Sequence, residues 1–385
     1  MSVPTPSWRP LSPAERAVAI EVLTGGPLSR SAVARRLGMS GASLTRLAKP
    51  LIDAGLLVEA PAEAAPPTQG RPGRPLDIVD GPWHFVGLKI TGDALYGVVA
   101  TLKSRVVRRE TRPLTDRDPE AVAELAGSLV DEFARDHPRL AGIGVGVGGR
   151  VRDRSVVAES LFLGWQDVPF AELLERRTKL PVVVENDVAA LVEAETWFGA
   201  GRGLDRFAVL TLGAGIGYGL VIGGTPVHSA DEGYGLGRHW IIDPAGPLTP
   251  EGQRGSAVSM LSIPGIEYQV HAATGTRIPY ETILELARSG EPLASRVITE
   301  AGRALGILLA NIANFALPEK VLLAGEGVGL MEAAADTVSE TLAAHRHPAA
   351  RPLDLETKVS DFHDWARGAA VLAIQVLVLG GREGG

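Results

Sequence analysis

The sequence lacks cysteine altogether and has no long apolar run. The absence of cysteine from 385 residues excludes disulfides, Cys-ligated zinc, iron–sulfur clusters and thiol catalysis. No apolar stretch approaches the roughly 20 residues that cross a bilayer, and the N-terminal MSVPTPSWRP lacks the apolar core of a signal peptide. Because 45% of the residues are hydrophobic and 22% are charged, we expect a soluble cytoplasmic protein with two or three domains.

Charge is distributed unevenly along the chain. Residues 1–75 contain nine Lys or Arg and five Asp or Glu, a balance of +4, whereas the whole chain carries −7. The remainder is therefore strongly acidic. A small basic head on a large acidic body is typical of proteins in which only the head contacts a polyanion such as DNA.

Helix-start and turn signals organise the basic head. Ser12-Pro13-Ala14-Glu15 forms a capping box and predicts a helix that ends near Thr24, before Gly25-Gly26. A second helix is predicted from Ser29 to Leu37, Gly38 allows a left-handed turn, and Ser40 caps a third helix to about Ala54. Two helices joined by a short turn with glycine are typical of a helix-turn-helix, and a small bundle that binds protein is the alternative.

The second helix of that pair is expected to enter the major groove of DNA. Its exposed N-terminal side is predicted to meet base edges, whereas two further side chains are better placed for phosphates. The predicted contacts are Ser40, Gly41, Ala42, Ser43 and Arg46 for the groove, and Thr45 and Lys49 for phosphates.

Two short apolar segments, 56–58 and 76–79, predict a hairpin that completes a winged helix. The intervening segment is rich in Pro, Gly and Ala and ends in GRPGRP, residues 70–75. An extended backbone that carries Arg71 and Arg74 fits a narrow A·T minor groove, where negative potential attracts arginine. A plain flexible linker is the alternative.

From Trp83 onward the pattern is that of an α/β protein, with strands alternating with helices. Strands are expected at 85–90, 95–102, 141–147, 181–184, 207–212, 218–222 and 320–323, and helices at 119–136, 171–178, 188–198 and 365–379. Polar or glycine-rich segments follow the strands: Glu185-Asn186-Asp187, Gly213–Gly217 and Ala324–Gly327. Open sheets bind ligands at such strand ends.

These segments together resemble the ROK family, which comprises transcriptional repressors and sugar kinases with a two-lobed, actin-like ATPase fold. The resemblance covers nearly the whole chain. It rests on LGWQDVPFAELLERRTKLPVVVENDVAALVEAETWFGAGRG from Leu163, TLGAGIGYGLVIGG from Thr211 and VLLAGEGV from Val321. A winged helix before such a body is typical of the repressor branch of the family and is absent from the kinase branch.

The resemblance implies that Asp187 matches the family's catalytic base, Asn186 a ligand of sugar hydroxyls, and Gly213–Gly217 a phosphate loop. However, Lys89 stands where the kinases carry the Asp of Asp-Ile-Gly-Gly-Thr, and Thr91 replaces the second glycine. A cation opposes Mg²⁺, and a side chain at position 91 hinders the approach of the backbone to phosphate. We therefore expect that ATP-dependent catalysis is lost, that Asp187 is a vestigial base, and that no cofactor is needed.

The family's zinc site is expected to be lost as well. Of its ligands His239 remains, but Thr249, Glu251 and Ser256 stand where the family has cysteines. Thr and Ser are poor zinc ligands, so we expect no metal, and the loop is instead expected to be held by hydrogen bonds.

The sugar pocket is altered too, because Leu236 and Val258 stand where the family carries glutamates. Asn186, Asp187 and His239 remain as effector contacts. They either persist as a scaffold without a ligand, or bind a sugar or sugar derivative in a retuned pocket, or bind an unrelated effector.

We therefore expect a sequence-specific DNA-binding regulator, a repressor of carbohydrate-related genes. Residues 10–80 form its winged helix-turn-helix and 81–385 its body, in which lobe 1 is about 81–195 plus the C-terminal helix and lobe 2 about 196–360. Its partners are operator DNA, a sugar-like effector and further copies of itself as a homodimer or homotetramer, without a membrane. The alternatives are a sugar kinase with an accessory DNA-binding head and a ligand-independent DNA binder.

Overall fold

The computed structural model describes residues 10–61, 74–81, 83–229, 231, 233, 235–359 and 361–380. The chain forms two compact units: unit 1 runs to Phe198 and resumes at Phe362, and unit 2 is Gly199–Asp361. Unit 2 is thus an insertion in unit 1. Arg71, one of the two arginines assigned to the minor groove, lies outside the described residues.

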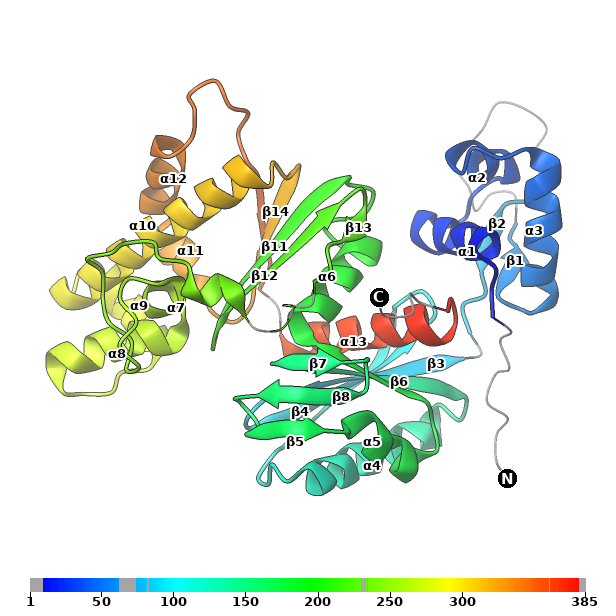
Figure 1. The fold of residues 1–385 in the computed structure, drawn as a ribbon, viewed down its shortest axis with the longest axis horizontal. Helices are drawn as coiled ribbons and strands as arrows, with labels where there is room; N and C mark the ends of the chain where they lie inside the picture. The colour runs from blue at the N-terminus through cyan, green and yellow to red at the C-terminus, as the bar shows by residue number, and fades with distance from the viewer. Residues whose placement is uncertain are drawn as a thin grey trace. The chain divides into compact units, whose positions relative to one another are not determined.

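Unit 1 begins with three helices and a small hairpin (Figure 1): α1 (Pro13–Gly25), α2 (Arg30–Arg36), α3 (Gly41–Asp53), β1 (Leu57–Glu59) and β2 (Leu76–Ile78). All five elements were predicted from the sequence. The capping box at α1 is complete, since Ser12 Oγ accepts the backbone N–H of Glu15 and the Glu15 carboxylate accepts that of Ser12. Gly38 has a φ of +62°, the left-handed turn expected between α2 and α3.

The body of unit 1 is built on a five-stranded sheet of order β10-β6-β3-β4-β5. The strands are β3 (His84–Ile90), β4 (Ala94–Thr101), β5 (Val106–Pro113), β6 (Leu140–Val147) and β10 (Val182–Asn186). Strands β10, β6 and β3 are parallel, while β4 and β5 add antiparallel strands. The parallel strands place their carboxyl ends at one edge, where Asn186 lies.

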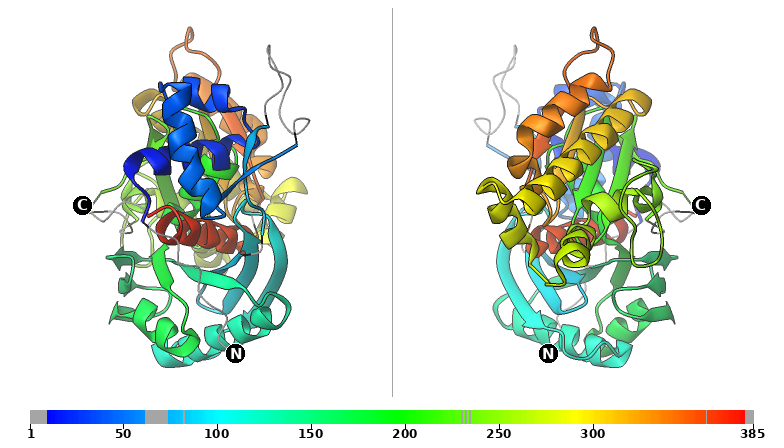
Figure 2. Two further views of the ribbon diagram at one scale, coloured as in Figure 1. Left: turned by 90° about the vertical axis from the view of Figure 1, so that its right-hand side faces the viewer. Right: turned by 90° about the vertical axis from the view of Figure 1, so that its left-hand side faces the viewer.

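Helix α13 (Phe362–Leu377) covers one face of this sheet, and α4 (Pro119–Asp136) and α5 (Phe170–Thr178) lie on the other (Figures 1 and 2). The predicted packing of the C-terminal helix onto the first lobe is confirmed, although the helix begins at Phe362 rather than Trp365. Glycines allow the close approach: a Cβ at Gly87 would overlap the carbonyl oxygen of Ala366, and one at Gly144 that of Ala369. These glycines serve helix–sheet packing.

Helix α6 (Asp187–Phe198) follows β10 directly. The sequence predicted that the strand ends at Val184 and that the helix begins at Val188, and both bounds were wrong. Glu185 and Asn186 continue the parallel ladder opposite Gly146 and Val147, so the strand runs straight into the helix. A small three-stranded sheet of β7 (Arg150–Arg152), β8 (Val156–Ser160) and β9 (Trp165–Val168) completes unit 1.

Unit 2 contains a second five-stranded sheet, of order β13-β12-β11-β14-β15. Its strands are β11 (Arg206–Leu212), β12 (Ile216–Ile222), β13 (Thr225–Pro226), β14 (Lys320–Ala324) and β15 (Asp354–Thr357). Its helices are the 3₁₀ turn η2 (Leu236–His239), α7 (Ala257–Leu261), α8 (Ile263–Thr274), α9 (Tyr280–Arg288), α10 (Pro292–Phe315), α11 (Gly329–Ala333) and α12 (Ala335–Ala344). No helix in the described ranges is both long enough and apolar enough to cross a membrane.

Candidate functional site

Helix α3 has one buried and one exposed face. Leu44, Ala48 and Leu51 are fully buried in the core of the three-helix segment. The opposite side is exposed, and it carries Gly41, Ala42, Thr45, Arg46 and Lys49. The predicted contact residues therefore share one accessible surface, with short side chains at the N-terminal end and basic ones beyond them.

Several polar groups on this surface already have partners within the helix. Ser40 Oγ accepts the Ser43 N–H at 3.1 Å, which caps the helix. The Thr45 hydroxyl donates to the Gly41 carbonyl at 2.9 Å, so it offers a phosphate no donor unless this bond breaks. Lys49 pairs with Asp53 at 3.1 Å, and both side chains are well exposed. In the described part of the chain Arg46 forms no ion pair, which leaves its guanidinium available.

The structure adds Arg35, on α2, to the residues that the sequence singled out. Arg35 and Arg74 are exposed, and neither forms an ion pair with any described residue. By contrast, Arg30 and Arg36 are held by Glu59 and Glu21 at 2.7 Å. A sequence pattern cannot separate free from paired arginines, because the partners of Arg30 and Arg36 lie 29 and 15 residues away.

A salt bridge links the hairpin to the sheet of unit 1. Lys103, in the β4–β5 turn, pairs with Asp77 of β2 at 2.7 Å, and the Asp77 carboxylate is largely buried. The same turn is held from α13, since Arg367 Nε donates to the Ser104 carbonyl at 3.0 Å. This turn therefore contacts both the hairpin and the C-terminal helix.

Asp187, the residue matched to the catalytic base, forms a buried ion pair with Lys89. Lys89 Nζ donates to Asp187 Oδ2, and their side chains are only 6% and 13% exposed. Asp187 Oδ1 accepts the backbone N–H of Val188 at 2.8 Å. The ammonium also lies 5.4 Å from the ring centroid of Trp365 on α13. Both carboxylate oxygens thus have donors from the protein.

Asn186 is committed to the local structure as well. Its Oδ1 accepts the backbone N–H groups of Val188 and Ala189, which caps α6, and its Nδ2 donates to the Gly149 carbonyl at 2.8 Å. Sequence reasoning placed Asn186 and Asp187 correctly at the end of a parallel strand. It did not reveal that these two side chains hold the strand–helix junction.

Phe162 is a neighbour of Asp187 that the sequence did not indicate. A Cβ at Gly148 would lie 2.9 Å from the Phe162 ring and 3.4 Å from Asp187 Oδ2, so the ring and the carboxylate flank this glycine. The Phe162 side chain is 47% exposed. An exposed aromatic face beside polar groups suits the apolar face of a sugar ring.

His239 belongs to unit 2, in η2, and contacts the loop that replaces the zinc segment. Its Nδ1 is 3.0 Å from Nε2 of Gln253. Thr249 Oγ1 accepts the Gln253 N–H, and Ser256 Oγ accepts the Ser259 N–H and caps α7. Because the neutral hydroxyls of Thr249 and Ser256 are poor zinc ligands and already accept backbone N–H groups, these two residues do not fit a zinc ion. Their hydrogen bonds instead hold the loop.

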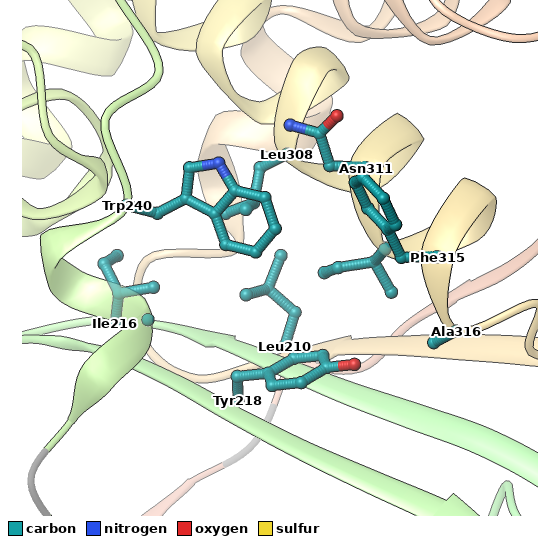
Figure 3. Close-up of a pocket in the computed structure, with 10 residues that line it drawn as sticks. Leu210, Ile216, Tyr218, Trp240, Leu308, Asn311, Phe315 and Ala316 are labelled. Carbon is teal, nitrogen blue, oxygen red and sulfur yellow. The ribbon is translucent and has the colours of Figure 1, made fainter.

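A small apolar pocket of about 80 Å³, partly open to solvent, lies between the sheet of unit 2 and α10. Figure 3 shows Trp240, Tyr218 and Phe315 around it, with Asn311 at the rim. Leu210, Ile216 and Leu308 complete much of the wall. Sugars require several hydrogen-bonding groups, and this wall is almost entirely apolar. None of the predicted effector residues lines it.

The predicted phosphate loop, Gly213–Gly217, forms the tight connection between β11 and β12. Gly213 N donates to the Gly215 carbonyl at 3.0 Å, and Gly217 N donates to Thr211 Oγ1 at 3.1 Å. The Ala214 N–H faces the carboxylate of Glu326, which follows β14.

Comparison with known proteins identifies relatives of two kinds. The DNA-binding transcriptional repressor Mlc of Escherichia coli (strain K12) is 25% identical over 313 residues, which cover 77% of this chain and 77% of Mlc. The crystal structure of a ROK family transcriptional regulator, a homolog of E. coli MLC, matches with a TM-score of 0.79 and 25% identity and covers 95% of this chain and 96% of that one. A ROK family glucokinase from Streptomyces griseus, in complex with glucose and AMPPNP, matches with a TM-score of 0.62 and 25% identity over 75% of this chain and 98% of that one.

The family model described as "ROK family" matches residues 85–376. This range contains the sheet of unit 2, the sheet of unit 1 except for His84, and most of α13. The resemblance deduced from the strand-end motifs is thereby confirmed, and the chain belongs to the ROK family.

Proposed function

We propose that the protein is a sequence-specific DNA-binding repressor of carbohydrate-related genes, whose affinity for DNA is modulated by a small ligand. The exposed face of α3 with its unpaired Arg46 carries this proposal. The similarity to a solved regulator supports it, because 95% coverage leaves too little of the chain to omit residues 10–80, whereas the kinase structure covers 75%.

In this proposal residues 10–80 form a winged helix-turn-helix. Helix α3 lies in the major groove with Arg46 on a base edge and Lys49 near a phosphate, and β1 and β2 form the wing. Arg71 and Arg74 reach the adjacent minor groove. Two heads in a homodimer read an inverted repeat whose half-sites lie about one helical turn apart, or a multiple of it.

The proposed effector contacts are Asn186 and Asp187 in unit 1 and, separately, His239 in unit 2. A sugar hydroxyl that donates to Asp187 must replace the Lys89 ammonium or share the carboxylate with it, and Phe162 offers the adjacent apolar surface. Since each such exchange substitutes one hydrogen bond for another, each sugar hydroxyl adds only a small net free energy of binding. The ligand alters DNA affinity only through its different affinities for the two states of the protein.

We further propose that the protein is not a kinase. A general base must accept the hydroxyl proton, and each oxygen of Asp187 already accepts one protein donor, which restricts the directions from which a hydroxyl can approach. Thr91 is likewise occupied, since its hydroxyl bonds Asp93 Oδ1 and the Ala94 carbonyl in the β3–β4 turn. In this proposal Asp187 and Thr91 therefore stabilise the local structure instead of binding a metal or a phosphate.

The test is selection of bound sequences from random duplex DNA at a fixed salt concentration. An enriched inverted repeat is expected. D-glucose is then titrated into the complex of the protein with a duplex that carries this repeat, and the affinity for the duplex is measured. Binding to all sequences without enrichment would contradict sequence-specific regulation. ATP turnover with glucose is measured in parallel, and turnover that disappears in Asp187→Asn would show that the kinase alternative is correct.

A further inference from the structure

The two glycine-rich loops of unit 2 meet at one edge of its sheet. Strands β11 and β14 are parallel neighbours, so the loop after β11 and the loop after β14 lie side by side. Gly327 N donates to the Leu212 carbonyl at 2.8 Å. Gly325 has a φ of +99°, and a Cβ there would collide with the same carbonyl. The second loop therefore rests directly on the backbone of the first.

Glu326 lies between these two glycines, and its side chain extends over the Gly213–Gly217 loop. Its Oε1 accepts the Ala214 N–H at 2.9 Å. Its carboxylate also lies over Gly213, where a Cβ would overlap it and force the carboxylate to move. The glycine therefore leaves the space that the carboxylate occupies.

The loop that carries Glu326 is firmly positioned. The hydroxyl of Tyr280, a residue only 3% exposed, donates to the Gly327 carbonyl at 2.8 Å. No basic side chain of the described ranges forms an ion pair with Glu326. Its negative charge therefore faces the backbone N–H of the loop rather than a lysine or arginine.

Backbone N–H groups in a glycine-rich turn form a concave site for anions, and a carboxylate and a phosphate compete for the same donors. We propose that Glu326 is the resident anion of the Gly213–Gly217 loop and that it keeps phosphate groups out. The carboxylate is tethered to the site, so a free ligand competes against a high effective concentration as well as against like charge.

The test compares the full-length protein with Glu326→Gly, Glu326→Gln and the control Glu332→Gln, an exposed glutamate on α11. Inorganic phosphate and AMPPNP are titrated by calorimetry and by thermal shift, at constant ionic strength. We expect no saturable binding to the wild type or Glu332→Gln over the titrated range. Glu326→Gly is expected to bind with an apparent Kd at least about tenfold below the highest concentration titrated, and Glu326→Gln is expected to bind more weakly than Glu326→Gly.

The two probes distinguish the source of the phosphate. Binding of both to Glu326→Gly indicates a site for any phosphate, and binding of AMPPNP alone indicates a nucleotide site opened by the substitution. Equal binding by wild type and Glu326→Gly would overturn the proposal, as would no binding by either variant while their melting temperatures match the wild type. If Glu326→Gly does not fold, the comparison of phosphate binding between the isosteric Glu326→Gln and the wild type tests the proposal instead. Operator binding is measured separately, so its failure bears only on the proposed function.

Discussion

Lys89 of β3 and Asp187 of α6 form a buried ion pair across the parallel edge of the unit 1 sheet, 98 residues apart in the chain. By the resemblance to the family, the lysine stands at the position where the kinases carry an aspartate, and its ammonium lies against the carboxylate that matches their base. Under the proposed function this one residue would place a cation where a metal would be organised and pair it with the matched base.

Removing one member of this pair is expected to destabilise the protein more than removing both. Asp187→Asn leaves the Lys89 ammonium buried without a counter-charge and is expected to lower the free energy of unfolding by about 3 kcal/mol. The double variant Lys89→Met/Asp187→Asn is expected to recover part of this loss. Urea unfolding of wild type, both single variants and the double variant gives the coupling energy, and strictly additive losses would show that the pair contributes nothing.

Arg46 and Lys49 are expected to have different effects on DNA binding. Arg46→Ala is expected to cost about 1–3 kcal/mol on the selected site and to relax the base preference at one position. Lys49→Ala serves as the matched control on the same helix face. It is expected to weaken binding to all sequences equally, and only slightly because Asp53 already pairs with this lysine. Binding is measured by fluorescence anisotropy over a salt series, and identical profiles for the two variants would contradict the assignment.

The Lys103–Asp77 salt bridge is expected to hold the hairpin against the sheet of unit 1. Lys103→Met is expected to speed hydrogen exchange in β1 and β2 and to cost at most about 1 kcal/mol in global stability, because the lysine is partly exposed. Arg105→Met is the matched control in the same turn: its contact with Asp80 is longer, at 3.4 Å, and more exposed. Unchanged exchange in Lys103→Met would show that the bridge has no such role.

Two glycines of β6 allow a direct test of helix packing. Gly144→Ala places a methyl group on the Ala369 carbonyl of α13, and because the atoms it meets are helix backbone that cannot rotate aside, a loss of at least about 3 kcal/mol is expected. Gly146→Ala, two residues further on, meets only ordinary contacts, the nearest at 3.6 Å, and is expected to stay within about 1 kcal/mol of the wild type. Equal losses in chemical denaturation would refute the packing role of Gly144.

Glu319 is expected to make unit 2 sensitive to acid. Its carboxylate accepts the backbone N–H groups of Asp205 and Arg206, which lowers its pKa below the ordinary value of 4.5. A lowered pKa in the folded state contributes stability that is present above pH 4.5 and is lost as the pH falls through the folded value. Glu319→Gln is expected to melt earlier at neutral pH and to converge with the wild type in acid. A difference in melting temperature between the two proteins that stays the same at all pH values would contradict this.

In the head the sequence predicted every helix and strand, because the signals there are local. The caps Ser12, Ser29 and Ser40 and the turn glycine Gly38 each act within a few residues, and the three helices of the head follow from them. Strand β5 was not predicted, because its sequence, VVRRETRP, is dominated by charged residues. It is an edge strand, and such strands often carry charge, which removes the apolar alternation that marks a strand.

The candidate sites were predicted only in part, for a related reason. The type and position of Asn186 and Asp187 followed from a buried strand and its polar end. Their partners depend on sheet order, because Lys89 reaches Asp187 only when β3, β6 and β10 are neighbours. In the same way Glu326 meets Ala214 because β11 pairs with β14, 112 residues away in the chain. Local patterns contain no information on such pairings.

The position of α13 has a consequence for synthesis on the ribosome. The helices and hairpin of the head have all emerged by residue 78, but their apolar core continues into β3, β4 and α13, whose residues come later. The sheet of unit 1 likewise waits for residues 362–377, because α13 covers β3, β4 and β6. Until then one face of that sheet has no covering helix, while unit 2 is made and folds. A nascent or truncated chain that lacks its last helix would therefore leave apolar surface uncovered on the sheet and on the head alike, because α13 contributes to the core that these two parts share.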